Sequence, residues 1–235
     1  MAMLIVAAAV FLFLHLIVAG TRLRDAVVGA VGEQAYLGAF SLASVGGIVW
    51  LAISYNLAAA QGSAVLWDLG PGVSHMGILV LALAFWLGVP GLLTANPTTV
   101  GMEGVAARED SVAGVLRITR HPFLWSVALW AAFHLAANGD AASAVFFGTF
   151  LVLSVCGTFS IDGKKARKMG EAWVSFSRRT SNIPFAAVLA GRTTLKLGEL
   201  FTWRQLAALI AFLAVLFGHA WAFSASPFPG GWVPF

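Results

Sequence analysis

Three histidines of this 235-residue chain stand inside long apolar segments: His15, His134 and His219. An ionisable side chain at membrane depth is costly and therefore usually has a partner or a function, although a neutral ring bonded to one backbone carbonyl is the simpler alternative. Because Cys156 is the sole cysteine, thiolate clusters that bind zinc or iron–sulfur centres are excluded. Imidazoles with few acidic neighbours favour haem iron, which takes one or two axial histidines, over zinc.

The neighbours of two of these histidines suit a flat apolar macrocycle. Trp130 precedes His134 by one helical turn, and Ala131 leaves room for a close approach. Phe11 precedes His15 by one turn. We therefore expect aromatic walls beside both imidazoles, with Trp130 shaping a haem pocket.

Depth along the membrane normal favours a different pairing of the histidines. At a rise of 1.5 Å per residue, His134 and His219 lie about 21 and about 22 Å from the arginines that precede their segments. His15 lies only about 10 Å from the next arginine. Depth alone thus pairs His134 with His219, which makes His219 the reserve ligand, while helix tilt keeps a pair of His15 and His134 open.

A basic sequence, Arg117-Ile118-Thr119-Arg120-His121-Pro122, directly precedes the segment that carries His134. Proline suits the first helical position, where its missing amide hydrogen would lack a partner. The unpaired amides behind it, together with Arg117, Arg120 and His121, would attract a phosphate, a carboxylate or a haem propionate. The alternative is that the arginines only fix topology and touch lipid phosphates.

These residues must be positioned by membrane helices, because only 10% of the residues are charged and the mean hydropathy is +0.88. An average soluble domain carries about 25% charged residues, so a soluble domain and nucleic-acid binding are both excluded. Six apolar runs are long enough to cross a bilayer. The expected fold is one all-α domain, an integral membrane bundle of six transmembrane helices over residues 2–19, 37–59, 73–93, 122–137, 141–159 and 205–223.

All fourteen basic residues fall in the first, third and fifth connections between these runs. By the positive-inside rule those connections are cytoplasmic, and both termini lie on the other side. Residues 160–204 form the longest connection, in which Arg178 and Arg179 lie between the apolar residues Trp173, Phe176, Ile183 and Phe185. We expect a cytoplasmic amphipathic segment lying against anionic lipid, with ligand binding as the alternative.

A short internal repeat connects two of the histidines. The pattern His-Leu-x-x-x-Gly occurs from His15 to Gly20 and again from His134 to Gly139. The two copies begin opposite halves of the six-run pattern, as expected of inverted repeats around a shared site. A chance match in an apolar sequence is the alternative.

Several motifs in order resemble the NnrU family over most of the chain: His15-Leu16, Val65-Leu66-Trp67-Asp68, Arg117 to Pro122, Leu129 to Leu135, and Ala137-Asn138-Gly139-Asp140. The resemblance implies a multi-pass protein of the bacterial inner membrane with both termini periplasmic. NnrU proteins are associated with nitric oxide and nitrite metabolism in denitrifying bacteria, which implies a role in redox chemistry, sensing or haem handling. The superfamily includes the plant 15-cis-zeta-carotene isomerase, a membrane haem b protein.

The resemblance to that isomerase implies haem b with His15 and His134 as the iron ligands, and a haem-dependent polyene isomerase as the alternative function. The isomerase carries a cysteine three residues before its second ligand, whereas this chain has Ala131 there. Two imidazoles without a thiolate favour electron transfer or gas sensing over ligand exchange. The implied partners are membrane lipid and either a hydrophobic small molecule or a redox partner.

A second resemblance is to membrane methyltransferases that use S-adenosylmethionine. It rests on Arg120-His121-Pro122, Gly170-Glu171-Ala172-Trp173, and Arg178-Arg179 before Pro184. It implies S-adenosylmethionine binding at the cytoplasmic surface. The chain departs from those enzymes because their frequent tandem acidic pair is missing, with Asp162 far from Glu171 in the sequence.

Overall fold

The computed structural model describes residues 1–228, apart from the side chains of Pro71, Ser74 and Glu109, and this part of the chain is helical. Its one isolated backbone bridge joins Val65 to Asp140. The helices and short helical turns are α1 (Ala2–Leu12), η1 (Phe13–Val18), α2 (Leu23–Val31), α3 (Glu33–Ala60), α4 (Pro71–Leu93), η2 (Glu103–Ala107), η3 (Glu109–Ser111), η4 (Gly114–Arg117), α5 (Pro122–Ala137), α6 (Ala141–Met169), α7 (Glu171–Arg179), α8 (Ala186–Leu189), η5 (Leu197–Leu200) and α9 (Trp203–Phe223).

The all-α prediction is confirmed, but the described residues give four to five candidate membrane spans rather than the six expected. Four helices are long and apolar enough: α3, α4 from His75, α6, and the stretch Leu197–Phe223. The first apolar run continues into α2 through a bend of 80°, and the pair counts as a fifth span only if taken together. Helix α5 has 16 residues, which extend about 24 Å, short of a hydrocarbon core of about 30 Å.

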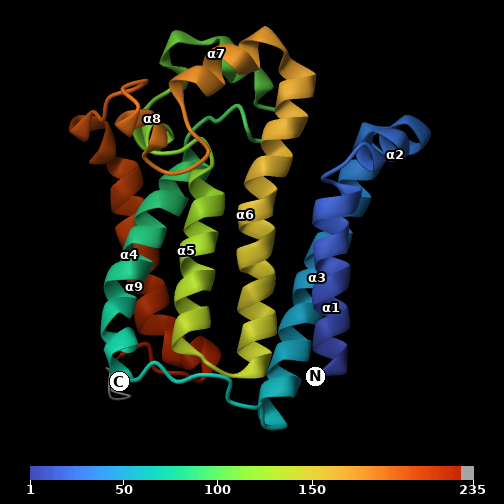
Figure 1. Ribbon diagram of the computed structural model, residues 1–235, viewed down its shortest axis with the longest axis vertical. Helices are drawn as coiled ribbons and strands as arrows, with labels where there is room; N and C mark the ends of the chain where they lie inside the picture. Colours follow the sequence, from blue (N-terminus) through green and yellow to red (C-terminus); the bar gives the residue numbers. More distant parts are fainter. Residues whose placement is uncertain (229–235) are drawn as a thin grey trace.

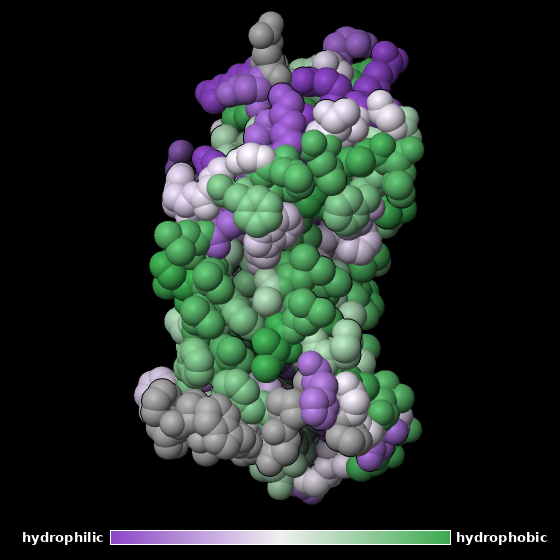
Figure 2. Space-filling view, turned by 90° about the vertical axis from the view of Figure 1, so that its left-hand side faces the viewer, coloured by the Kyte–Doolittle hydropathy of each residue, from purple (hydrophilic) through white to green (hydrophobic). Residues whose placement is uncertain are grey.

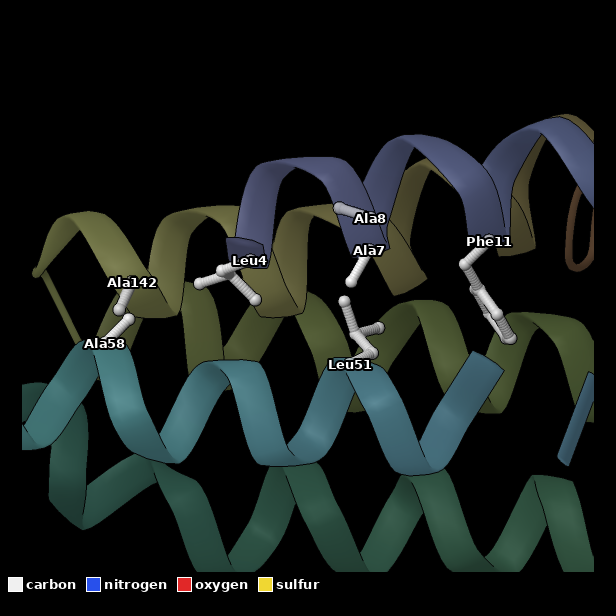
Figure 3. Packing of buried hydrophobic residues seen from close by; sticks show 7 residues of the cluster. All are labelled: Leu4, Ala7, Ala8, Phe11, Leu51, Ala58 and Ala142. Carbon is white, nitrogen blue, oxygen red and sulfur yellow. The ribbon is translucent and has the colours of Figure 1, made fainter. Parts of the chain in front are cut away.

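Helix α6 is the central element of the molecule. In Figure 1 it stands between α4, α5 and α9 on one side and α1 and α3 on the other. A buried cluster of Leu4, Ala7, Phe11, Leu51 and Ala142 joins α1, α3 and α6 (Figure 3). Its alanines allow the three backbones to approach closely, which is how membrane helices gain packing energy without a hydrophobic driving force.

The turn between α5 and α6 is the hairpin that Asn138-Gly139-Asp140 predicts. Asp140 caps α6 by accepting hydrogen bonds from the amides of Ala142 and Ser143, both at 3.0 Å. A Cβ atom on Gly139 would overlap the carbonyl of Trp67. Only glycine therefore allows the connection between α3 and α4 to pack against this turn.

The charges gather at one end of the bundle, where α2, α7, α8 and the turns η2 to η5 lie (Figure 1). We call this the basic end, because all fourteen basic residues lie in its connections or in the helix turns that border them. An apolar belt lies below it (Figure 2). Large apolar side chains of the membrane helices, such as Leu42 of α3 and Leu79 of α4, are exposed. Such a surface suits contact with lipid tails.

The connection 160–204 differs from the amphipathic interfacial segment expected. Its first part continues α6 to Met169, and α7 packs inward. Trp173 and Phe176, expected against lipid, are buried against Ala106 and Val112. The aromatic residues of α7 therefore build a small folded cap over the basic end.

Candidate functional site

Two imidazoles in the apolar belt share one hydrogen-bond arrangement. Nδ1 of His15 lies 2.8 Å from the carbonyl oxygen of Phe11, and Nδ1 of His134 lies 2.8 Å from that of Trp130. A carbonyl oxygen only accepts, so Nδ1 carries the proton in each neutral ring. This leaves the lone pair on Nε2, which is the tautomer that binds a metal through Nε2.

His15 lies within the π-helical turn η1 at the end of α1. Single π-turns inside α-helices occur frequently at functional sites. The ring lies 4.3 Å from Phe11 and 5.2 Å from Phe40 of α3, centroid to centroid. Oγ of Ser44 lies 3.4 Å from Nε2 while donating to the Phe40 carbonyl, so its contact with Nε2 is weak.

His134 lies among aromatic rings of α5 and α6. Phe147 stacks on it at 4.9 Å, and Trp130 lies at 5.1 Å. Trp130 thus forms a wall beside the imidazole, as the sequence predicts, and its carbonyl also fixes the tautomer. His219 lies on α9, and its own Nδ1 lies 2.8 Å from the carbonyl oxygen of Ala225.

The described contacts join the two imidazoles through three intervening rings. His15 touches Phe11, Phe11 touches Phe150 at 5.9 Å, Phe150 touches Trp130 at 5.6 Å, and Trp130 touches His134. The donor chemistry therefore fits an axial haem ligand at either histidine. Ligation of one iron by both histidines would require a macrocycle to replace part of this aromatic row.

A multidentate metal site is not formed by the described part of the chain, in which no three His, Cys, Asp or Glu side chains gather. Haem needs only one or two protein ligands because the porphyrin supplies four nitrogens. The pair of Nε2 donors is thus a better match to haem than to a mononuclear zinc site.

A second polar site lies at the basic end, around the carboxylate of Asp162 on α6. Arg120 donates to it from Nε at 2.8 Å and also from Nη2. His121 bonds to it through Nε2 at 2.7 Å, and Asn182 donates from Nδ2 at 2.9 Å. These four bonds tie the start of α5, the end of α6 and the segment after α7 together. We call this the Asp162 cluster.

The Asp162 cluster is largely closed to solvent, with His121 only 2% exposed. Burial lowers the pKa of His121 in spite of the neighbouring carboxylate, so the neutral ring donates its Nε2 hydrogen to Asp162. The guanidinium of Arg120 lies 5.5 Å from the ring centre of Trp173, within range of a cation–π contact. Two segments that resemble the methyltransferases therefore meet here, around an internal ion pair.

Arg117, the third basic residue expected to hold an anion, binds a different carboxylate of the chain. Its Nε lies 2.7 Å from Oε2 of Glu199, and its Nη2 lies 3.0 Å from Oε1. The amide of Gly114 donates to the same carboxylate at 2.8 Å. The anions that Arg117, Arg120 and His121 attract in this structure are thus Glu199 and Asp162 rather than an external group.

Sequence reasoning missed Asp162, Glu199 and Asn182 as site residues. Asp162 carried a usable signal, because it is the first carboxylate after the apolar run of α6 and faces a connection rich in arginine. Glu199 carried a similar signal, because it is a single carboxylate between the basic residues Lys196 and Arg204. Asn182 carried none, because its partner lies twenty positions away and only the turn after α7 brings them together.

Together these features define a helical membrane protein. Two of its imidazoles have Nδ1 bonded to a backbone carbonyl and Nε2 available to bind a ligand. Internal ion pairs connect the segments of its basic end. The model of the NnrU family, described as NnrU protein, matches residues 3–227. The chain therefore belongs to the NnrU family, which confirms the resemblance noted in its motifs.

Curated relatives include two plant proteins. The chain is 29% identical over 180 residues to the chloroplastic 15-cis-zeta-carotene isomerase of Arabidopsis thaliana, covering 74% of this chain and 47% of that protein. It is 28% identical over 131 residues to the isomerase of the same name from Zea mays, covering 52% of this chain and 36% of that protein. The chain thus spans less than half the length of these relatives. No solved structure matches it.

Proposed function

We propose that this protein binds haem b within the membrane and serves nitric oxide and nitrite metabolism by redox chemistry, sensing or haem handling. The observation that carries the haem proposal is the shared arrangement of His15 and His134, in which a backbone carbonyl holds Nδ1 and leaves Nε2 to bind iron. The nitrogen-oxide role rests on the NnrU resemblance.

Haem would supply reversible one-electron chemistry and an iron centre for gaseous ligands. The chain would hold it through Nε2 of His15 and of His134. The carbonyls of Phe11 and Trp130 fix both tautomers. The aromatic rings that remain beside the imidazoles would keep the polarity around the iron low, which is one of the properties that set a haem potential.

Absorption spectra test this proposal directly. Protein expressed with added haem and purified in detergent is compared, reduced minus oxidised, with His15→Ala, His134→Ala and His219→Ala. We expect sharp low-spin bands in the wild type that are lost in the first two variants and kept in the third. Phe133→Leu is the matched control, because Phe133 lies beside His134 at 5.6 Å without fixing its tautomer.

Two results would change the proposal. Bands lost in the His134 and His219 variants would assign the pair that depth alone favours. A wild-type protein that stays colourless with adequate haem would overturn haem binding altogether.

A second candidate function is cis–trans isomerisation of a polyene, and the similarity to two carotene isomerases favours it. Ala131 in place of a cysteine means that any ligand change at the iron would proceed without a thiolate from that position. The test is expression in a host that accumulates 15-cis-zeta-carotene. Chromatography would show conversion by the wild type and loss of conversion with His134→Ala if this function holds, and unchanged isomers if it does not.

We also propose a finer membrane arrangement: six spans in a bacterial inner membrane with both termini periplasmic. In support, α1 with η1 and the short helix α5 each run between the basic end and the opposite end of the bundle (Figure 1). The described chain begins at the end opposite the basic one, where α9 also finishes. The placement of every basic residue at the other end agrees with cytoplasmic connections there.

A further inference from the structure

An apolar groove of about 270 Å³ runs between α4 and α9 on the outer surface of the bundle. Leu79, Leu83 and Leu209 line it and are more than half exposed, while Ala82 leaves space at its floor. The groove lies within the apolar belt, on the side of Figure 1 that Figure 2 turns toward the viewer. Its shape and chemistry suit a long hydrocarbon chain.

A second cavity, of about 130 Å³, lies at the basic end between α4 and α9. Pro90, Ala113 and Val115 line it together with the polar residues Glu199, Thr202 and Arg204. Gln205 lines both the cavity and the groove. The two spaces therefore meet at one side chain, with charged groups above it and hydrocarbon below. An occupant of both spaces must be amphipathic.

Gln205 lies at this junction and is only 8% exposed as a whole residue, but its Nε2 is not among the buried side-chain atoms that lack a hydrogen-bond partner. Its Oε1 accepts from the amide and the hydroxyl of Thr202, at 3.0 and 2.8 Å, as part of the cap of α9. Those two donors fix the orientation of the amide. Among the residues that the structure describes, none accepts a hydrogen bond from Nε2. A carbonyl or phosphate oxygen in the cavity would satisfy it.

The charges around the cavity favour an anion. Glu199 is neutralised by Arg117 at 2.7 Å and also lies 3.8 Å from Lys196. Arg204 donates only from Nε, to the Leu93 carbonyl at 3.2 Å, and binds no carboxylate of the described chain. Its guanidinium lies over Trp203, which is exposed as expected for an aromatic residue at a membrane interface.

We propose that the cavity and groove bind one anionic glycerophospholipid. The phosphate lies beside Arg204, an ester carbonyl accepts the hydrogen bond from Nε2 of Gln205, and one acyl chain occupies the groove between α4 and α9. This site involves neither His15 nor His134, so it stands independently of haem binding.

Native mass spectrometry of the detergent-solubilised full chain tests the site. The protein is titrated with phosphatidylglycerol and, separately, with phosphatidylcholine carrying the same acyl chains. We expect one phosphatidylglycerol to bind at low concentration and to bind more tightly than phosphatidylcholine. Arg204→Ala should weaken phosphatidylglycerol binding about fivefold, the contribution of one basic residue near a lipid phosphate.

Two further variants probe the rest of the site without relying on Arg204. Gln205→Glu keeps the acceptor oxygen for both hydrogen bonds from Thr202 but removes the Nε2 donor and adds a negative charge, so it should weaken phosphatidylglycerol binding further. Ala82→Phe fills the groove and should weaken both lipids. Arg178→Ala is the matched control, because Arg178 is an exposed basic residue on α7, and it should leave binding unchanged.

The alternatives have distinct signatures. Inorganic phosphate that displaces the lipid would show a site for free phosphate and overturn the lipid assignment. Equal affinities for the two lipids, or equal losses in Arg204→Ala and Arg178→Ala, would overturn specific recognition of the headgroup. Unchanged binding in Ala82→Phe, with the variant folded by thermal unfolding, would overturn the groove.

Discussion

Individual side chains explain why the basic end is rigid and why its arginines were difficult to interpret. Sequence spacing predicts that Arg120 and His121 attract a phosphate, a carboxylate or a haem propionate. It cannot identify Asp162 as the carboxylate beside them, because that residue follows a whole helical hairpin later in the chain. The hydrogen-bond partners of His15 and His134 were easier to predict from the sequence. Their partners, Phe11 and Trp130, lie four residues earlier in the same helix, a spacing that is visible in the sequence.

Loss of the Asp162 charge should destabilise the fold strongly. Asp162→Asn keeps the shape but leaves Arg120, whose side chain is 13% exposed, without a counter-charge. Breaking a buried ion pair in this way costs about 3 kcal/mol or more. Thermal unfolding in detergent measures it. Asp25→Asn, at an exposed pair, should differ from wild type by less than about 0.5 kcal/mol; equal effects of the two variants would refute a central role for Asp162.

Acid should weaken a second ion-pair group at the basic end. Burial raises the pKa of Glu103, but hydrogen bonds from Lys165 and Lys168 outweigh it and lower that pKa from 4.5 to about 2. The pKa of Glu103 is lower in the folded protein than in the unfolded chain. The ion pairs of Glu103 therefore stabilise the fold fully above pH 4.5, and this stabilisation is lost as the pH falls from 4.5 toward 2. We expect Glu103→Gln to be less stable than wild type at pH 6. Unfolding curves recorded between pH 6 and pH 2 should show this gap closing; a constant gap would contradict it.

At the scale of elements, the repeated His-Leu-x-x-x-Gly pattern corresponds to a similar local structure in both places. Each histidine bonds to the carbonyl four residues earlier. Each glycine stands where a Cβ would overlap a backbone carbonyl, that of Leu16 for Gly20 and that of Trp67 for Gly139. The hairpin at Gly139 was predictable from its turn residues. The π-turn around His15 was not, because apolar periodicity does not distinguish one extra residue in a turn.

Gly139→Ala tests the tight contact between the two connections at the end opposite the basic one. The added methyl group overlaps the Trp67 carbonyl, so the bridge between Val65 and Asp140 must separate. We expect a loss of about 1–3 kcal/mol, typical of overpacking. Gly148→Ala on α6, where a Cβ meets no atom within 4 Å, is the control and should be at least as stable as wild type. Similar unfolding midpoints for both variants would disprove the steric argument.

For the whole molecule, hydropathy predicted the helical class and the segregation of charge correctly, but four to five of the six expected spans are clear candidates among the described residues. A count of apolar residues does not detect the 80° bend after η1. It does predict the bounds of α5, residues 122–137, but 16 residues are short for a membrane span. It also treated residues 160–204 as a surface segment, because it could not show that Trp173 and Phe176 would find Ala106 and Val112 to pack against. Those partners come from a distant connection.

Cysteine labelling in intact cells tests the orientation of the molecule. In a Cys156→Ser background, single cysteines replace Gln61, exposed at the end opposite the basic one, and Ser175, exposed on α7. An impermeant maleimide should label Gln61→Cys in intact cells and Ser175→Cys only after lysis. The reverse pattern would overturn the orientation, and labelling of both sites in intact cells would overturn the six-span arrangement.

The segregation of charge also has a consequence for the protein in an energised membrane. Fourteen basic side chains lie at or next to one end, whereas Asp68 and Asp140 are the only Asp, Glu, Lys or Arg side chains that the structure describes at the other. Moving one elementary charge against the potential requires about 2.3 kcal/mol per 100 mV. Once the basic end faces the negative side, voltage opposes inversion of the molecule. The membrane potential would therefore stabilise copies inserted this way relative to inverted ones.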